Sequence, residues 1–79
     1  MFAYTALRVA LPLPLPQLFD YAPPARATVD AGWIGCRVRV PFGRGHAIGV
    51  VAEVGPPEID PAKLKPASER LDTEPLIAG

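Results

Sequence analysis

Hydrophobic residues occupy every second position in three stretches of the chain, a pattern that predicts β-strands with one buried face. The stretches run from Thr5 to Leu11, from Cys36 to Phe42 and from Ile48 to Val54. In the third stretch the apolar residues are Ile48, Val50, Ala52 and Val54, and they alternate with Gly49, Val51 and Glu53. The last two stretches flank Gly43-Arg44-Gly45, a turn signal, and so predict a β-hairpin spanning Cys36–Val54.

Proline limits what the rest of the chain can form, because 11 of the 79 residues are proline, against an average near 5%. From Leu11 to Pro16 leucine and proline alternate, which keeps the backbone extended but removes hydrogen-bond donors. A ligand for a proline-reading domain is one interpretation. An edge strand that resists aggregation is the other, and we favour it because the alternate leucines require burial. Asp60-Pro61 predicts a single helical turn.

These patterns predict one domain, residues 1–79, of the all-β class. We expect a small antiparallel sheet or partly closed barrel with a proline-rich edge segment and at most one short helical turn. The length supports one modest core, and the hydrophobic content of 49% is that of a folded chain. Cys36 is the one cysteine, which excludes an internal disulfide. No apolar run reaches the roughly 20 residues that a membrane helix needs.

The net charge is zero, but its distribution is uneven. Residues 1–50 hold five basic and two acidic groups, while residues 51–79 hold three basic and six acidic groups. This distribution predicts a mildly basic face and no broad electrostatic footprint for nucleic acid.

No set of residues predicts catalysis or metal binding. His46 is the one histidine, and a metal site would require several converging ligands. Glycines at positions 43, 45 and 49 lack the spacing of a phosphate-binding loop, and a strand follows them where that motif requires a helix. We therefore expect neither a catalytic residue nor a metal in this chain.

Phe19-Asp20-Tyr21 is the triplet that best suggests a ligand site. In an extended backbone Phe19 and Tyr21 point to one side and Asp20 to the other. One interpretation is two core aromatics and a solvated aspartate. The other is a nucleotide pocket, with aromatic faces for a base and a carboxylate that accepts a hydrogen bond from a sugar hydroxyl. Arg37 and Arg39 share a strand face, either as its solvated side or as phosphate contacts.

The order of several short blocks resembles the opening of the PriA family of primosomal replication-restart helicases. The blocks are Val9 to Pro16, Phe19-Asp20-Tyr21, Gly35 to Gly43, Ile48 to Val51, Leu64-Lys65 and Leu71 to Pro75. Together they cover nearly the whole chain.

The resemblance implies that this region is a 3′-DNA-binding domain without catalysis of its own, at the N-terminus of a larger ATP-dependent helicase. The domain would hold the 3′ end of the nascent leading strand at stalled or repaired forks and D-loops, without base specificity. The family's pocket residues carry over to Phe19, Asp20, Tyr21, Gly43 and Lys65, with Lys63 as a rival for the last position. Asp20 would accept a hydrogen bond from the free 3′-hydroxyl.

The resemblance also implies that ATP, magnesium and zinc belong to the helicase portion outside this chain, and that the chain itself needs no cofactor. The implied partners are DNA, the remaining helicase domains, other primosome proteins and single-strand-binding protein, with no membrane. The implied location is the bacterial cytoplasm, at forks in the nucleoid. The alternatives are an SH3-like protein-interaction module whose basic hairpin docks protein or RNA, and a fragment that forms a lid over a distant active site.

Overall fold

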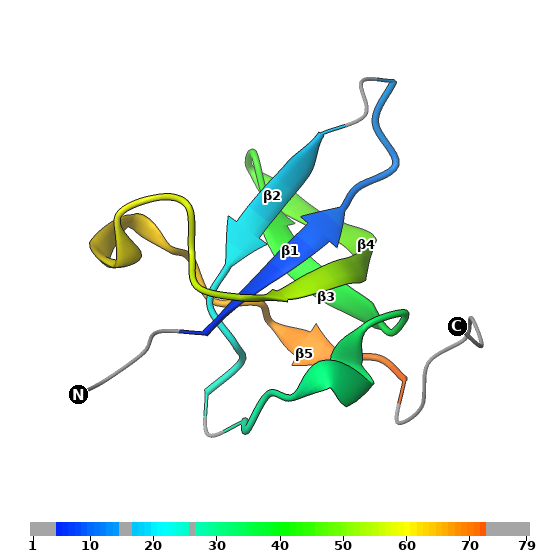
Figure 1. The fold of residues 1–79 in the computed structure, drawn as a ribbon. Coiled ribbons are helices and arrows are strands. Elements are labelled where there is room, and N and C mark those ends of the chain that lie inside the picture. The colour runs from blue at the N-terminus through cyan, green and yellow to red at the C-terminus, as the bar shows by residue number, and fades with distance from the viewer. Residues whose placement is uncertain (1–4, 15–16, 26, 73–79) are drawn as a thin grey trace.

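The computed structural model describes residues 5–14, 17–25 and 27–72 and shows a five-stranded antiparallel sheet (Figure 1). The strands are β1 (Ala6–Ala10), β2 (Leu18–Tyr21), β3 (Arg37–Phe42), β4 (Gly45–Gly55) and β5 (Glu69–Arg70). Two 3₁₀ turns lie between them, η1 (Ala31–Trp33) before β3 and η2 (Pro61–Lys63) before β5. The order across the sheet is β2-β1-β4-β3-β5. The all-β prediction is therefore confirmed. Leu15, Pro16 and residues 73–79, parts of two predicted segments, lie outside the described residues.

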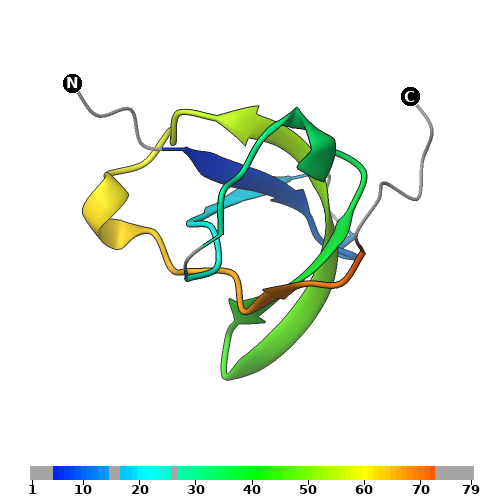
Figure 2. The ribbon, with the colours of Figure 1, turned by 90° about the horizontal axis from the view of Figure 1, so that it is seen from below.

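The predicted hairpin is β3 and β4, paired from Arg37 opposite Val50 to Phe42 opposite Gly45. Gly43 adopts a φ of 59°, in the left-handed region that glycine enters without the cost of a Cβ clash. The first half of β4 pairs with β3, and its second half pairs with β1. The strand therefore curves from one strand pair to the other, as Figure 2 shows.

The burial along β4 differs from the alternation expected for it. Ile48 is 47% exposed and Ala52 is exposed, whereas Val51 is buried. Ile48 lies opposite Arg39 on β3 and shares its face of the sheet, so the inward residues of this half of β4 are Ala47, Gly49 and Val51. In the β1–β4 pairing Arg8 lies opposite Glu53 but Val9 lies opposite Val51. This β-bulge leaves Ala52 unpaired, so the next residue of β4 that packs against the core is Val54. Single-residue alternation could not reveal the shift.

Inward-facing residues of four strands form one core with Leu11, with Trp33 from η1 and with Ala67. Its buried members are Leu7, Val9, Leu11, Tyr21, Trp33, Val38, Val40, Val51 and Ala67. Asp60 begins η2, as the sequence predicted, by accepting a hydrogen bond from the Ala62 amide at 3.0 Å. The sequence predicted at most one such turn, and η1, which brings Trp33 to the core, is a second.

The sheet is not closed, but its two edges approach each other beyond β2. The Ala22 amide donates to the Lys65 carbonyl at 2.9 Å, and the Ala67 amide donates to the Ala22 carbonyl at 2.9 Å. This isolated parallel bridge fastens the chain after η2 to the end of β2. The segment between β4 and β5 is thereby held beside the first two strands.

Candidate nucleotide pocket

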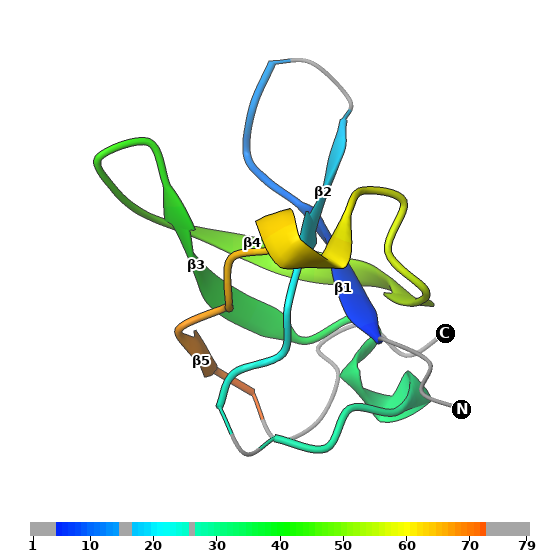
Figure 3. The ribbon, with the colours of Figure 1, turned by 90° about the vertical axis from the view of Figure 1, so that its left-hand side faces the viewer.

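A cavity of about 180 Å³ is lined by residues of β2, the end of β3 and the η2 segment. In Figure 3 the η2 turn is drawn in front of β2, with the β3–β4 hairpin to the left. Its lining residues are Phe19, Asp20, Tyr21, Pro41, Phe42, Gly43, Lys63 and Lys65. All five positions that the resemblance assigned to a pocket are among them, together with Lys63. Residues far apart in the sequence therefore meet around one hollow.

Aromatic rings form one side of the pocket. Phe19 on β2 and Phe42 on β3 pack edge to face, with ring centroids 5.6 Å apart and planes at 77°. Tyr21 is 5% exposed, and its hydroxyl donates to the Pro41 carbonyl at 2.9 Å. Burial raises the pKa of Tyr21 above 10.0. The exposed aromatic surface thus belongs to the two phenylalanines, while Tyr21 is also a core residue.

Asp20 is not a solvated side chain, since only 8% of it is exposed. Its Oδ2 accepts the Glu58 amide at 2.7 Å, and its Oδ1 lies 3.5 Å from Arg8 Nε. Arg8 is the residue opposite Asp20 on β1, so both side chains stand on the sheet face away from Phe19 and Tyr21, as alternation predicts. An ionised carboxylate offers about four lone-pair sites, so acceptor capacity remains after these two contacts.

Arg8 joins the strands to the segment after β4. Its guanidinium donates to the Pro56 carbonyl at 2.6 Å and lies 3.3 Å from a Glu53 carboxylate oxygen and 3.5 Å from one of Glu58. Together with the Asp20–Glu58 bond, these contacts fix the start of the η2 segment, and the Ala22–Lys65 bond fixes its end. The segment that carries Lys63 and Lys65 is therefore anchored at both ends.

The described basic side chains fall into two groups. Those that contact a carboxylate or an aromatic ring are Arg8, Arg37, Arg39 and Arg70. Among the described residues, those without such a contact are Arg44, Lys63 and Lys65. The two lysines line the pocket and Arg44 directly follows Gly43. Two of these three cations therefore line the pocket, although the net charge of the chain is zero.

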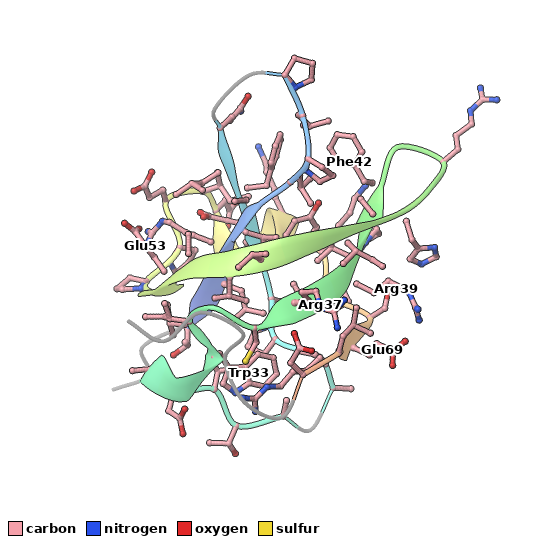
Figure 4. The ribbon with its side chains drawn as sticks, turned by 90° about the vertical axis from the view of Figure 1, so that its right-hand side faces the viewer. Trp33, Arg37, Arg39, Phe42, Glu53 and Glu69 are labelled. Atoms are coloured by element: carbon pink, nitrogen blue, oxygen red, sulfur yellow. The ribbon has the colours of Figure 1, made fainter. Side chains whose placement is uncertain are left out.

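The sequence analysis left two interpretations of Arg37 and Arg39, phosphate contacts or a solvated strand face. Both side chains are paired with acidic residues near the chain's end. Arg37 contacts Asp72 through Nε and Nη2 at 3.1 and 3.0 Å, and Arg39 pairs with Glu69 (Figure 4). Hydrogen bonds from Arg37 hold the pKa of Asp72 below its usual value. This pairing could not be predicted from the local pattern, because 30 or more residues separate the partners.

Gly43 lines the pocket at the turn of the β3–β4 hairpin. A Cβ built there would meet no atom within 4 Å, so the glycine is needed for its backbone conformation and not for space. The turn can then approach a ligand closely through its backbone.

Sequence reasoning did not assign Phe42 and Pro41 to the site. Phe42 continues an alternating apolar run, and that pattern is typical of a core position. Lys63 was left as a rival of Lys65, whereas both lysines line the pocket.

Within the described residues there is no group of three or more metal-binding side chains. Cys36 is buried. None of the described helical turns has the length and apolar character required to cross a membrane. The arrangement of aromatic rings and lysines is suited to binding a nucleotide, and Asp20 is the acidic residue that borders it.

The model of the PriA 3′-DNA-binding domain family matches residues 8–79. The chain is also 41% identical, over 72 residues, to the replication restart protein PriA of Haemophilus influenzae. That alignment covers 90% of this chain and 10% of the relative, so the chain spans about a tenth of the relative's length.

Proposed function

Because the chain belongs to the family of PriA 3′-DNA-binding domains, we propose that it holds the 3′-hydroxyl end of the nascent leading strand at stalled or repaired replication forks, without base specificity. The observation that carries this proposal is the pocket itself, which gathers exposed aromatic surface, two lysines and Asp20 around one small cavity. Few cations are needed there, since a single terminal nucleotide brings few phosphates.

In the proposed complex the base lies against an aromatic ring and the last phosphate faces Lys63 and Lys65. Every base has a π-face, so stacking tolerates all four bases. The free 3′-hydroxyl donates a hydrogen bond to Asp20, whose carboxylate can only accept. Arg8 and the Glu58 amide keep that carboxylate in place.

The same carboxylate disfavours a strand that continues past the pocket. An internal 3′-oxygen is esterified and cannot donate, and its phosphate carries negative charge toward Asp20. Two unit charges about 4 Å apart near a protein surface repel by roughly 4 kcal/mol before screening by salt. One residue can therefore favour a free end and reject an extended or phosphorylated one.

The remaining parts of the proposal concern a longer protein. We propose that the domain targets an ATP-dependent restart helicase, whose other portion uses ATP, magnesium and zinc, to forks and D-loops in the bacterial cytoplasm. Primosome proteins and single-strand-binding protein would act with that helicase. The likeness to a replication restart protein supports these assignments.

The direct experiment compares a short linear single strand with a circular strand of the same composition, each titrated by fluorescence anisotropy. We expect the linear strand to bind and the circle to bind several-fold more weakly. Equal binding would refute end recognition. No binding to either strand would favour the SH3-like interaction module or the lid fragment instead.

A further inference from the structure

The core face of β3 extends beyond the core. Val38, Val40 and Phe42 share this face by strand alternation. Both valines are fully buried, whereas Phe42 is 38% exposed. The inner face of the sheet is therefore covered at Val38 and Val40 and uncovered at Phe42, which lines the pocket. Figure 4 shows Phe42 near the hairpin end of β3.

β2 shows the same change from covered to uncovered. Tyr21 and Phe19 lie opposite the fully buried Leu7 and Val9 of β1. Tyr21 is 5% exposed, while Phe19 is half-buried and also lines the pocket. The pocket is thus the open end of the hydrophobic core, and a flat apolar group placed there would complete it.

The contact between Phe19 and Phe42 leaves room for such a group. In an edge-to-face pair, the edge of one ring meets the face of the other, so further aromatic surface stays available for a third ring. Tyr21 offers none, because its ring is buried and its hydroxyl is bonded to Pro41. Among the three rings that line the pocket, Phe42 is the most exposed.

We propose that Phe42 is the stacking platform for the base of the bound nucleotide, that Phe19 supports its ring edge to face, and that Tyr21 serves as structural packing. The inference rests on the proposed function and adds the residue that binds the base. Lys63 and Lys65 line the same pocket and would face the phosphate. Base recognition by stacking alone accounts for a site that ignores base identity.

The test combines Phe42→Leu, which keeps an apolar side chain without the ring, with an oligonucleotide whose 3′-terminal nucleotide lacks its base. We expect Phe42→Leu to weaken binding of the complete oligonucleotide by roughly 5- to 150-fold, the loss typical of one stacked base. The native chain should lose a similar factor when the terminal base is removed. For Phe42→Leu, base removal should change little, since the two partners form one interaction.

Ile48→Ala is the matched control, because Ile48 is an exposed apolar residue of the same hairpin that does not line the pocket. It should bind like the native chain. Unfolding by urea, followed for each variant, separates loss of binding from loss of folding. Phe42→Trp adds a spectroscopic readout, because a base stacked on the new indole should quench its fluorescence, whereas Trp33 is buried.

Two results would overturn the proposal, and they are distinguishable. If Phe42→Leu binds like the native chain, or loses the same further factor on base removal, Phe42 is not the platform, although preference for a free end can remain. If the native chain binds linear and circular strands equally, the proposed function itself fails, and the platform fails with it.

Discussion

At the scale of single residues, the sequence context suggests a ligand-binding role for Tyr21 and a core position for Phe42, and the structure shows the opposite burial for each. Tyr21 stands in the triplet that looks like a ligand site, yet its ring is core and its hydroxyl bonds to Pro41. Phe42 stands in an alternating core run, yet it is exposed. Burial in the folded chain, and not the local pattern, decides which ring can meet a base.

Replacing Tyr21 by phenylalanine tests this assignment. Tyr21→Phe should cost about 1 kcal/mol of unfolding free energy, through the lost hydrogen bond to Pro41, and should leave DNA affinity unchanged. Urea unfolding and an oligonucleotide titration of the same sample measure both. A large loss of affinity in a folded variant would place the tyrosine hydroxyl in the binding site.

The raised pKa of Tyr21 gives the same variant a pH signature. The folded chain retains the phenolic proton at a pH where the unfolded chain, near its ordinary value of 10.0, has released it. The stabilisation by the neutral hydroxyl is therefore complete below that pH and is lost as the pH rises toward the folded-state pKa. The stability difference between native chain and Tyr21→Phe should shrink in alkali. A constant difference would mean that burial does not affect the proton.

At the scale of elements, the close approach of β1 and β4 depends on Gly49. A Cβ there would lie 2.4 Å from Val9 Cγ1 and 2.7 Å from the Ala10 carbonyl oxygen. These distances require the two strands to separate.

Gly49→Ala should therefore destabilise the chain by about 1–3 kcal/mol, the usual cost of overpacking. Gly45→Ala is the control in the same strand, because a Cβ at Gly45 meets nothing within 4 Å, and its effect should stay within about 0.5 kcal/mol. Chemical denaturation of both variants is the measurement. Equal stability of the two would mean that β1 and β4 can separate without cost.

Much of the sheet could be predicted from the sequence because strand alternation and turn chemistry are local. The β3–β4 hairpin and the Asp60-Pro61 turn are confirmed. The bulge opposite Arg8 and the short β5 could not be predicted, since they depend on pairing between segments distant in sequence. In β4 the register with β3 places Ile48 opposite Arg39 and leaves it exposed while Val51 is buried, which alternation within the strand alone did not predict.

The candidate site shows the same limit. The residues around Phe19 and Gly43 were identified by family resemblance, and alternation correctly placed Asp20 on the opposite face. The partners of Asp20 could not be inferred, because Arg8 and Glu58 reach it from β1 and from the segment after β4. Tertiary contacts convert an apparently solvated aspartate into a largely buried one.

At the scale of the whole molecule, most of the described arginines are paired with acidic residues, whereas the two described lysines line the pocket. Within the described residues, the cations without a carboxylate or aromatic contact are Arg44, Lys63 and Lys65, and the two lysines line the pocket. The arginines on β3 are instead paired with Asp72 and Glu69. An overall charge of zero is therefore compatible with a local site for a phosphate.

Because only a few cations are available to contact phosphates, we expect DNA binding to depend weakly on salt. With one or two phosphates in contact, log K against log salt should have a slope of about −1, from roughly −0.7 per phosphate on single strands. Engagement of all three cations would bring it to about −2. Anisotropy titrations across a salt series measure the slope. A slope several times steeper would mean that a long track of phosphates, and not an end pocket, carries the binding.

Recognition of the free 3′ end by Asp20 can be measured in one competition assay. Two oligonucleotides that differ only in a 3′-hydroxyl or a 3′-phosphate compete for the native chain and for Asp20→Asn. Because both strands compete for the same sample, their affinity ratio does not depend on how much of a variant is folded. The native chain should prefer the hydroxyl by at least about tenfold, equivalent to ~1.4 kcal/mol, whereas the asparagine amide gains donors and loses the repulsion, so the preference should fall toward unity. Equal affinity of the native chain for the two oligonucleotides would contradict the account.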